Sequence, residues 1–240
     1  ISLIIILLSN MNNNTPNNCC NESLNSNIGF LFDLDGVLID SEKEYTKIWA
    51  EIDRQFPSGF EDLPTRIKGM TLTEIIDTYF GEPHKRAAVP KLLYELEGKM
   101  KYEWLPGARE LLLWLKEHNI PSVLVTSSNE VKMRHLREEL PELESFFTAI
   151  VTGDKVTKSK PDPEGYRLGA KLIERDPLNC VVFEDSLQGV KAGRAAGAFV
   201  VGVEGTLPSS SIQPFSDAVI KSLSEIDKEK LIQTLSSRSL

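Results

Sequence analysis

Cysteine and basic charge are both scarce in this sequence, and each scarcity excludes a class of function. The 240 residues include three cysteines, Cys19 and Cys20 in a polar stretch and Cys180 in an apolar run. This placement provides neither a disulfide framework nor a zinc-ligand pattern and is typical of a reducing compartment, so we expect a cytoplasmic protein. The 27 Lys and Arg are outnumbered by 35 Asp and Glu, for a net charge of -8. Because no basic stripe is available for a phosphate backbone, we expect no nucleic acid partner, although a local pocket can still bind a small anion.

Long hydrophobic runs are also missing. The apolar stretch ISLIIILL (1–8) is much shorter than the roughly 18 residues of a candidate membrane span, and it lacks the basic flank and cleavage site of a signal peptide. The Asn-rich, low-complexity stretch that follows (10–27) cannot bury a hydrophobic core. We therefore predict a disordered tail over residues 1–26 and expect no membrane partner.

Short apolar runs rich in Val and Ile alternate with helical segments from Ile28 onward. The runs predict strands at 28–32, 121–126, 148–152, 180–184, 198–203 and, with a weaker pattern, 217–220. Helices are expected at 108–117, 130–140, 163–174, 187–196 and 227–235. Strands that are apolar throughout are typical of a parallel sheet buried on both faces, and their alternation with helices favours right-handed crossovers. We therefore predict an α/β fold with a doubly wound parallel sheet.

The long interval between the first two strands breaks this alternation. Residues 41–104 have helical patterns, and one face of the first helix consists of Tyr45, Ile48, Trp49, Ile52 and Phe56. A second helix opens with Thr71 and Glu74 in capping-box spacing, and a third returns the chain to the sheet. We therefore expect a small helical subdomain inserted after the first strand.

Two acids follow the first strand directly. Asp33 and Asp35 are two residues apart in an extended segment, so their side chains face the same side, and Gly36 permits a tight turn after them. In open parallel sheets, ligands bind beyond the carboxyl ends of the strands, which places both carboxylates at a binding edge. The alternative is a pair of solvated acids in an ordinary Asp-Gly turn. Such crowding of like charges is unfavourable unless a positive charge lies among them.

Polar side chains also follow three other predicted strands. The second strand ends in TSSN, where Thr126 and Ser127 offer hydroxyl groups and amides to an anion, although such residues also cap helices. Lys160 follows the third strand, although a lone lysine is usually a solvated surface residue. The fourth strand ends with Glu184 and Asp185, for which helix capping is the alternative. Because these strand ends share one edge, the acids can bind a hard cation such as Mg²⁺, while the hydroxyls and the lysine hold a phosphoryl group.

The strand ends carry four motifs, DLDGVLIDS (33–41), VLVTSS (123–128), SKPDP (159–163) and FEDSLQGVKAGRAAG (183–197). With these motifs in this order, the chain resembles the haloacid-dehalogenase superfamily of phosphotransferases over residues 28 to about 205. The helical insert looks like the cap of the branch that contains β-phosphoglucomutase and small sugar-phosphate phosphatases. The resemblance implies a core domain at 27–40 and 105–240 and a cap at 41–104.

The resemblance also implies roles for the residues at the strand ends. Asp33 would be the nucleophile and Asp35 the general acid/base. The residues expected to bind the phosphoryl group are Thr126, Ser127 and Lys160. The expected Mg²⁺ ligands are Asp33, the backbone carbonyl of Asp35, Glu184 and Asp185. A carboxylate nucleophile forms an aspartyl phosphate, which divides one difficult displacement into two easier steps.

On this basis we expect a Mg²⁺-dependent phosphatase that acts as a monomer on a small phosphorylated metabolite, with a sugar phosphate favoured. The alternatives are a phosphomutase of the β-phosphoglucomutase type and a non-catalytic phosphate-binding module. β-Phosphoglucomutases carry a His where this chain has Tyr45, and an Arg after a cap Lys-Gly pair where it has Leu72. A mutase needs cations for the phosphate that is not transferred, so both differences favour the phosphatase, although Arg66 and Lys68 could compensate.

The substrate is expected to contact the cap at Trp49, Lys68, Gly69 and Thr71. For Trp49 the alternative is a place in the hydrophobic core, where an aromatic residue on the apolar face of a helix usually lies. Residues that line a pocket and residues that fill a core are alike in a single sequence, so the choice between these two interpretations is left open here.

Overall fold

The computed structural model describes residues 27–67, 70, 72–205, 209–228 and 230. Its centre is a six-stranded sheet in the order β3-β2-β1-β4-β5-β6, and every neighbouring pair is parallel. The strands are β1 (Gly29–Phe32), β2 (Ser122–Val125), β3 (Ala149–Val151), β4 (Cys180–Glu184), β5 (Phe199–Val203) and β6 (Ala218–Ile220). β1 therefore lies inside the sheet, between β2 and β4.

The two faces of the sheet bury separate hydrophobic cores, as strands that are apolar throughout predict. Phe32 of β1 and Phe183 of β4 lie in one core with their rings stacked and the ring centroids 4.9 Å apart. Leu31, whose side chain points to the opposite face, lies in the second core with Val182. Since each strand contributes to both cores, neither face is left to solvent, and the predicted doubly wound parallel sheet is confirmed.

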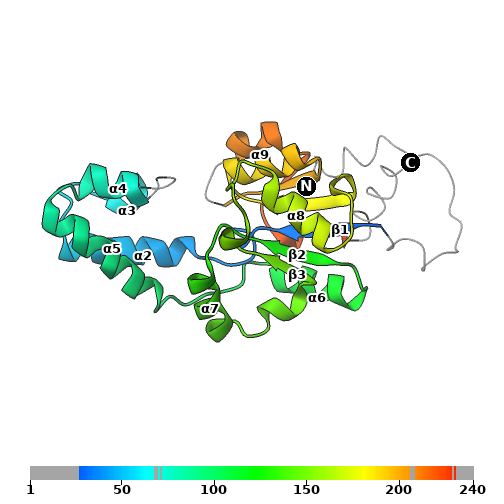
Figure 1. Ribbon diagram of the computed structural model, residues 1–240, viewed down its shortest axis with the longest axis horizontal. Helices are drawn as coiled ribbons and strands as arrows, with labels where there is room; N and C mark the ends of the chain where they lie inside the picture. Colours follow the sequence, from blue (N-terminus) through cyan, green and yellow to red (C-terminus); the bar gives the residue numbers. More distant parts are fainter. Residues whose placement is uncertain (1–26, 68–69, 71, 206–208, 229, 231–240) are drawn as a thin grey trace, which may run out of the picture.

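Helices cover both faces of the sheet (Figure 1). α6 (Ala108–Glu117) and α7 (Glu130–Glu139) contribute to the core that contains Phe32, whereas α8 (Glu164–Leu172) and α9 (Leu187–Ala196) contribute to the other. These helices begin and end within two residues of their predicted bounds. The shorter elements are α10 (Ser209–Ile212) and 3-10 helices at Leu143–Phe146, Gly153–Lys155, Pro177–Asn179, Gln213–Phe215 and Leu223–Glu225. The predicted helix at 227–235 lies mostly outside the described residues.

Four helices, here called the insert helices, follow β1 before the chain returns to β2. They are α2 (Glu42–Gln55), α3 (Leu63–Arg66), α4 (Leu72–Tyr79) and α5 (Pro83–Glu97). In Figure 1 they lie together to the left of the sheet. The sequence pattern does not predict α3, because four residues are too few to show a helical period. Thr71, the expected first residue of the capping box, lies outside the described residues.

Two neighbouring segments join the insert helices to the sheet. Ile39 and Trp104 form an antiparallel bridge, and the Asp40 amide donates to the Glu103 carbonyl at 3.0 Å. The chain therefore leaves and re-enters the core at one place, just beyond the carboxyl end of β1. In the part of the chain that the structure describes, no helix combines the length and apolar character needed to cross a membrane. The division into tail, core and cap stays a prediction.

Candidate active site

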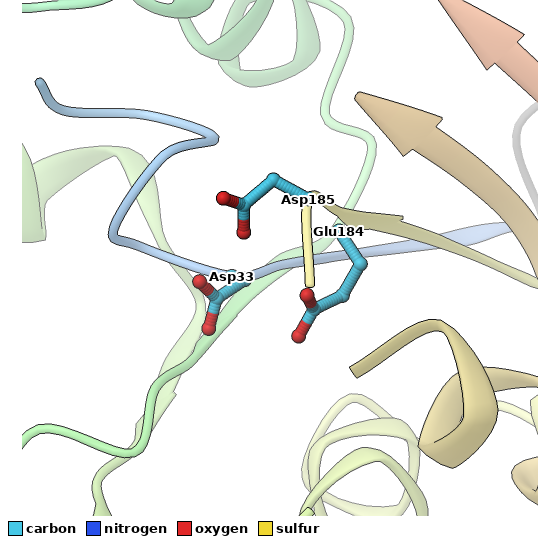
Figure 2. Close-up of side chains that lie close together, drawn as sticks. All are labelled: Asp33, Glu184 and Asp185. Carbon is cyan, nitrogen blue, oxygen red and sulfur yellow. The ribbon is translucent and has the colours of Figure 1, made fainter. Parts of the chain in front are cut away.

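The carboxyl ends of β1 and β4 bring three acids together. Phe32 pairs with Phe183, and the Asp33 amide, one residue further, donates to the Phe183 carbonyl at 3.0 Å. This register places Asp33 beside Glu184 and Asp185, and one carboxylate oxygen from each lies within 4.8 Å of the others. Figure 2 shows the three carboxyl groups around a common space between the two strand ends. The acids at the ends of the first and fourth strands therefore lie together, as the sequence predicts.

Lys160 supplies a positive charge to this cluster. Its Nζ donates to Asp33 Oδ1 at 2.5 Å, to Glu184 Oε1 at 2.6 Å and to the Val125 carbonyl at 3.2 Å. The Lys160 side chain is 13% exposed, so both ion pairs are largely shielded from water. The residue lies after β3, and its peptide bond to Pro161 is cis. One of the positive charges that the crowded acids require is therefore part of the protein itself.

Glu184 is held on both of its carboxylate oxygens. Oε1 accepts from the Tyr166 hydroxyl at 2.8 Å in addition to Lys160. Oε2 accepts from the Ser186 amide at 3.1 Å and from the Ser186 hydroxyl at 2.9 Å. The Ser186 hydroxyl oxygen in turn caps α9 by accepting from the Gly189 amide. Glu184, with no exposed surface, is thus fixed by α8 and α9 together.

The electrostatics of the cluster favour a further cation. Burial raises the pKa of Asp33 well above its ordinary value, an effect that Lys160 opposes and the negative charges of Glu184 and Asp185 reinforce. For Lys160, burial works to lower the pKa, but the charges of Asp33 and Glu184 outweigh it and the pKa is raised. Two of the three acids, Asp33 and Glu184, therefore share the ammonium group of Lys160. Carboxylate oxygens in this arrangement are the donor set that Mg²⁺ prefers, so the residues fit such an ion.

Gly36 lets the chain turn close to the acids. Its φ is +78°, in the left-handed region that favours glycine. A Cβ added there would lie 2.2 Å from Asp185 Oδ2, which is closer than any real contact. The turn that the sequence predicts after Asp35 is therefore also a point of tight approach between the first and fourth strand ends.

Asp35 points to a different partner from Asp33. Lys132 Nζ donates to its two carboxylate oxygens at 2.7 and 2.8 Å, and the Ser128 hydroxyl donates to Oδ2 at 3.2 Å. Burial would raise the pKa of Asp35, but the charge and hydrogen bond of Lys132, together with hydrogen bonds from side chains such as Ser41, outweigh it and lower the pKa. Asp35 is therefore ionised at neutral pH in this arrangement.

Lys132 is a site residue that the sequence reasoning missed. It lies in the first turn of α7, after the N-cap Asn129, whose side chain accepts from the Lys132 amide at 3.0 Å. The first turn of a helix favours acidic residues, because the amide groups there carry partial positive charge. A lysine is therefore unusual in that turn. Its position at the carboxyl edge of a parallel sheet was the sequence signal that could have identified Lys132 as a site residue.

A cavity of about 560 Å³ opens beside the acids. Its lining comes from the strand ends, the start of α7 and two insert helices, and includes Asp33, Asp35, Tyr45, Glu97, Thr126, Ser127, Lys132, Lys160 and Asp185. The Thr126 hydroxyl oxygen accepts from the Ser128 amide at 3.0 Å, which orients the turn after β2. The cavity thus brings together the residues predicted at the strand ends except Glu184, which lies buried behind it, and the roles assigned to them stay predictions.

The residues predicted to contact substrate from the insert are placed only in part. Trp49 is 7% exposed, and its ring stacks on Phe80 with the centroids 6.4 Å apart. It also lines a second cavity of about 270 Å³ within the insert helices, as does Leu72. Lys68, Gly69 and Thr71 lie outside the described residues. Trp49 thus belongs to the hydrophobic core and borders a cavity at once.

Comparison with known proteins finds a matching family, similar sequences and a similar fold. A family model described as haloacid dehalogenase-like hydrolase matches residues 29–197. Hexitol phosphatase A of Escherichia coli is 34% identical over 208 residues, which cover 84% of this chain and 94% of that protein. The β-phosphoglucomutase of Bacillus subtilis is 30% identical over 215 residues, which cover 84% and 92%. A family IA hydrolase structure from Entamoeba histolytica shares the fold, with a TM-score of 0.73 at 23% identity over 87% of this chain and 99% of that one.

Proposed function

Because the chain belongs to the haloacid dehalogenase-like hydrolase family, we propose that it is a Mg²⁺-dependent phosphatase of small, sugar-like phosphate monoesters. The observation that carries this proposal is the position of Asp33. Its carboxylate borders the 560 Å³ cavity, accepts from Lys160, and lies beside the two acids that end β4. A nucleophile, a counter-charge and a set of hard oxygen donors therefore meet at one point of the cavity wall.

In the proposed reaction Asp33 attacks the phosphorus atom of the ester and forms an aspartyl phosphate, which water then hydrolyses. Lys160 neutralises charge on the transferred group, and the hydroxyl and amide groups of Thr126 and Ser127 orient its oxygens. Mg²⁺, held by Asp33, Asp185 and Glu184 with the backbone carbonyl of Asp35, supplies further charge neutralisation when bound. These roles rest on the strand-end geometry and on the family resemblance together.

Asp35 would transfer the proton in both steps. It must be protonated when the alcohol leaves and ionised when it takes a proton from the attacking water. The ion pair with Lys132 keeps it ionised, which suits the second step. Lys132 therefore favours the form of Asp35 that accepts a proton from the attacking water.

The second candidate function is a phosphomutase, which the likeness to the β-phosphoglucomutase of Bacillus subtilis favours. The described part of the cavity lining argues against it, because its only basic side chains, Lys132 and Lys160, are already paired with Asp35 and Asp33. Arg66 donates to the Glu61 carbonyl and lies over the ring of Phe60, away from this lining. A second phosphate would find no cation among these groups.

A phosphate-release screen with Mg²⁺ tests the proposal. We expect release from hexose, pentose or polyol monophosphates without any sugar bisphosphate, with Asp33→Asn as the inactive control. Conversion of β-glucose 1-phosphate to glucose 6-phosphate faster than phosphate release, and only after bisphosphate priming, would establish the mutase instead. No turnover of any ester, aryl phosphate included, would leave a non-catalytic binding module. Gel filtration tests the accompanying proposal that the protein is a monomer.

A further inference from the structure

Glu97 lies where the catalytic cavity meets the second cavity of the insert. It is the last residue of α5, and it lines both the 560 Å³ cavity beside Asp33 and the 270 Å³ cavity among the insert helices. Two residues of α2, Glu42 and Tyr45, also line both. A phosphate ester bound at Asp33 with its organic part directed towards the insert must therefore pass these three side chains.

The carboxylate of Glu97 has one hydrogen-bond partner among the described residues. The Tyr45 hydroxyl donates to its Oε1 at 2.9 Å, and within that part of the chain no basic side chain forms an ion pair with it. Lys132 lies nearby, 5.5 Å from the Tyr45 ring centroid, but its ammonium group is bound to both oxygens of Asp35. Glu97 is half-buried, and burial raises its pKa, partly opposed by Tyr45 and Lys132. A carboxylate in this position is stabilised by a neutral donor such as a hydroxyl group.

The same position disfavours an anionic group. A second phosphate on the substrate would bring negative charge close to a half-buried carboxylate, and like charges in a partly dehydrated site repel strongly. Among the described residues, the apolar side of the second cavity, with Ile67, Ile75 and Leu93, offers such a phosphate no hydrogen-bond donors. An uncharged chain or ring with hydroxyl groups meets neither obstacle.

We propose that Glu97, with Oε1 held by Tyr45, selects substrates whose leaving group is uncharged and donates a hydroxyl hydrogen bond to Oε2, and rejects esters with a second phosphate. This inference rests on the proposed phosphatase function and adds the residue that selects among its esters. It assigns Glu97 as a specificity residue that touches the leaving group and takes no part in the reaction at phosphorus.

The test compares three probes with wild type and three variants. The probes are sorbitol 6-phosphate, with a hydroxylated leaving group, p-nitrophenyl phosphate, without one, and fructose 1,6-bisphosphate. Glu97→Ala removes the acceptor, and Glu97→Gln removes the charge while keeping the shape. Glu95→Gln is the matched control, because Glu95 lies on the same helix but is exposed and paired with Lys99.

We expect Glu97→Ala to lower kcat/KM for sorbitol 6-phosphate by about 10- to 100-fold, mainly through KM, and to leave p-nitrophenyl phosphate within about threefold. Glu97→Gln should raise kcat/KM for fructose 1,6-bisphosphate by about tenfold, because the repulsion is removed. Glu95→Gln should match wild type with every probe. Melting curves establish that the variants are folded.

Two results would overturn the inference while leaving the phosphatase intact. One is an equal loss of sorbitol 6-phosphate and p-nitrophenyl phosphate turnover in Glu97→Ala, and the other is bisphosphate hydrolysis by wild type as fast as that of sorbitol 6-phosphate. Absence of phosphate release by wild type from all three probes is a different outcome. It would overturn the proposed function itself, and this inference with it.

Discussion

The strand ends and the insert helices contribute to one cavity in different ways. At the strand ends, Asp33, Lys160 and Glu184 are joined by ion pairs that are almost fully buried. On the insert helices, ion pairs such as Glu51 with Arg54 lie on the exposed surface, and the cavity receives Tyr45 and Glu97 linked by a single hydrogen bond. The first region is held by many mutual contacts, whereas the second is held mainly by the apolar packing beneath it.

This difference separates chemistry from selection. Reacting groups must keep their geometry within a fraction of an ångström, which a parallel sheet with paired strand ends provides. Groups that select a leaving group can vary with less harm to the fold, because each insert helix needs only its apolar face to stay packed. Changes in the first region should therefore abolish turnover of every ester, while changes in the second should redistribute turnover among esters or lower stability.

The largest expected effect is at Asp33. Asp33→Asn keeps the volume of the side chain but removes the nucleophile and a proposed metal ligand, so phosphate release should fall by a factor on the order of 10³ or more for every ester. Steady-state phosphate release measures it, with circular dichroism as the control for folding. Release within tenfold of wild type would falsify the assignment of Asp33.

Metal removal should act almost as strongly. We expect excess chelator to abolish turnover and added Mg²⁺ to restore it, while Ca²⁺ restores little because its larger, looser ligand shell misplaces the reacting groups. Asp185→Ala should lose activity across all esters in the same way. Full activity in excess chelator would contradict the metal site and would leave Lys160 as the sole counter-charge.

Lys132 tests whether a residue on the helix that follows a strand is needed for turnover, as the residues at the strand ends are expected to be. Lys132→Met frees Asp35 from its ion pair, so kcat should fall by about 10- to 100-fold for alkyl phosphates, with Lys132→Arg partly restoring it. Arg134→Met is the matched control, because Arg134 is an exposed basic residue on the same helix. Equal behaviour of the Lys132 and Arg134 variants would place Lys132 outside the catalytic machinery.

Trp49 tests the same comparison with a residue of the insert helices. Because Trp49 is buried and stacked on Phe80, Trp49→Ala should lower the free energy of unfolding by about 3 to 5 kcal/mol. Turnover of p-nitrophenyl phosphate should stay within a few-fold of wild type at temperatures where the variant is folded. Urea titration gives the stability. A large rise in KM for one ester without loss of stability would instead make Trp49 a substrate contact.

The smallest expected effect is on the stability of the metal-free protein. The pKa of Asp33 is raised in the folded state, so the folded state holds that proton more tightly than the unfolded state does. Stability should therefore fall as pH rises above the ordinary carboxyl pKa of about 4 towards the raised value. Asp33→Asn should show a shallower fall and a higher Tm at neutral pH in chelator. Parallel Tm profiles for wild type and variant would mean that Asp33 is not the strained group.

The strands and the strand-end acids could be predicted from the sequence for the same physical reason. A strand buried on both faces is a continuous apolar run, and the first polar residue after it marks the edge of the sheet. β1 is predicted at 28–32 and observed at Gly29–Phe32, and Asp33 follows it directly. The pairing of β1 with β4 then brings Asp33 beside Glu184 and Asp185.

The insert could not be predicted to the same depth. A helical period marks the apolar face, but it does not say which residues at the rim of that face border a cavity. Tyr45 belongs to the predicted apolar face and still donates to Glu97, a pairing between residues on two helices that no local pattern encodes. The four-residue α3 shows no period at all. Packing between helices determines these features, and the sequence pattern of one helix does not show how that helix packs against another.

The close approach at Gly36 has a consequence for mutational scanning. Glycine offers no functional group, yet any side chain at position 36 would collide with the carboxylate of Asp185 and would sit on a backbone angle that favours glycine. A saturation library scored for growth or turnover should therefore assign position 36 the same intolerance as the acids themselves. The site requires that no Cβ be present at position 36, just as it requires the carboxylate oxygens nearby. Tolerance scores alone would therefore count Gly36 among the reacting residues.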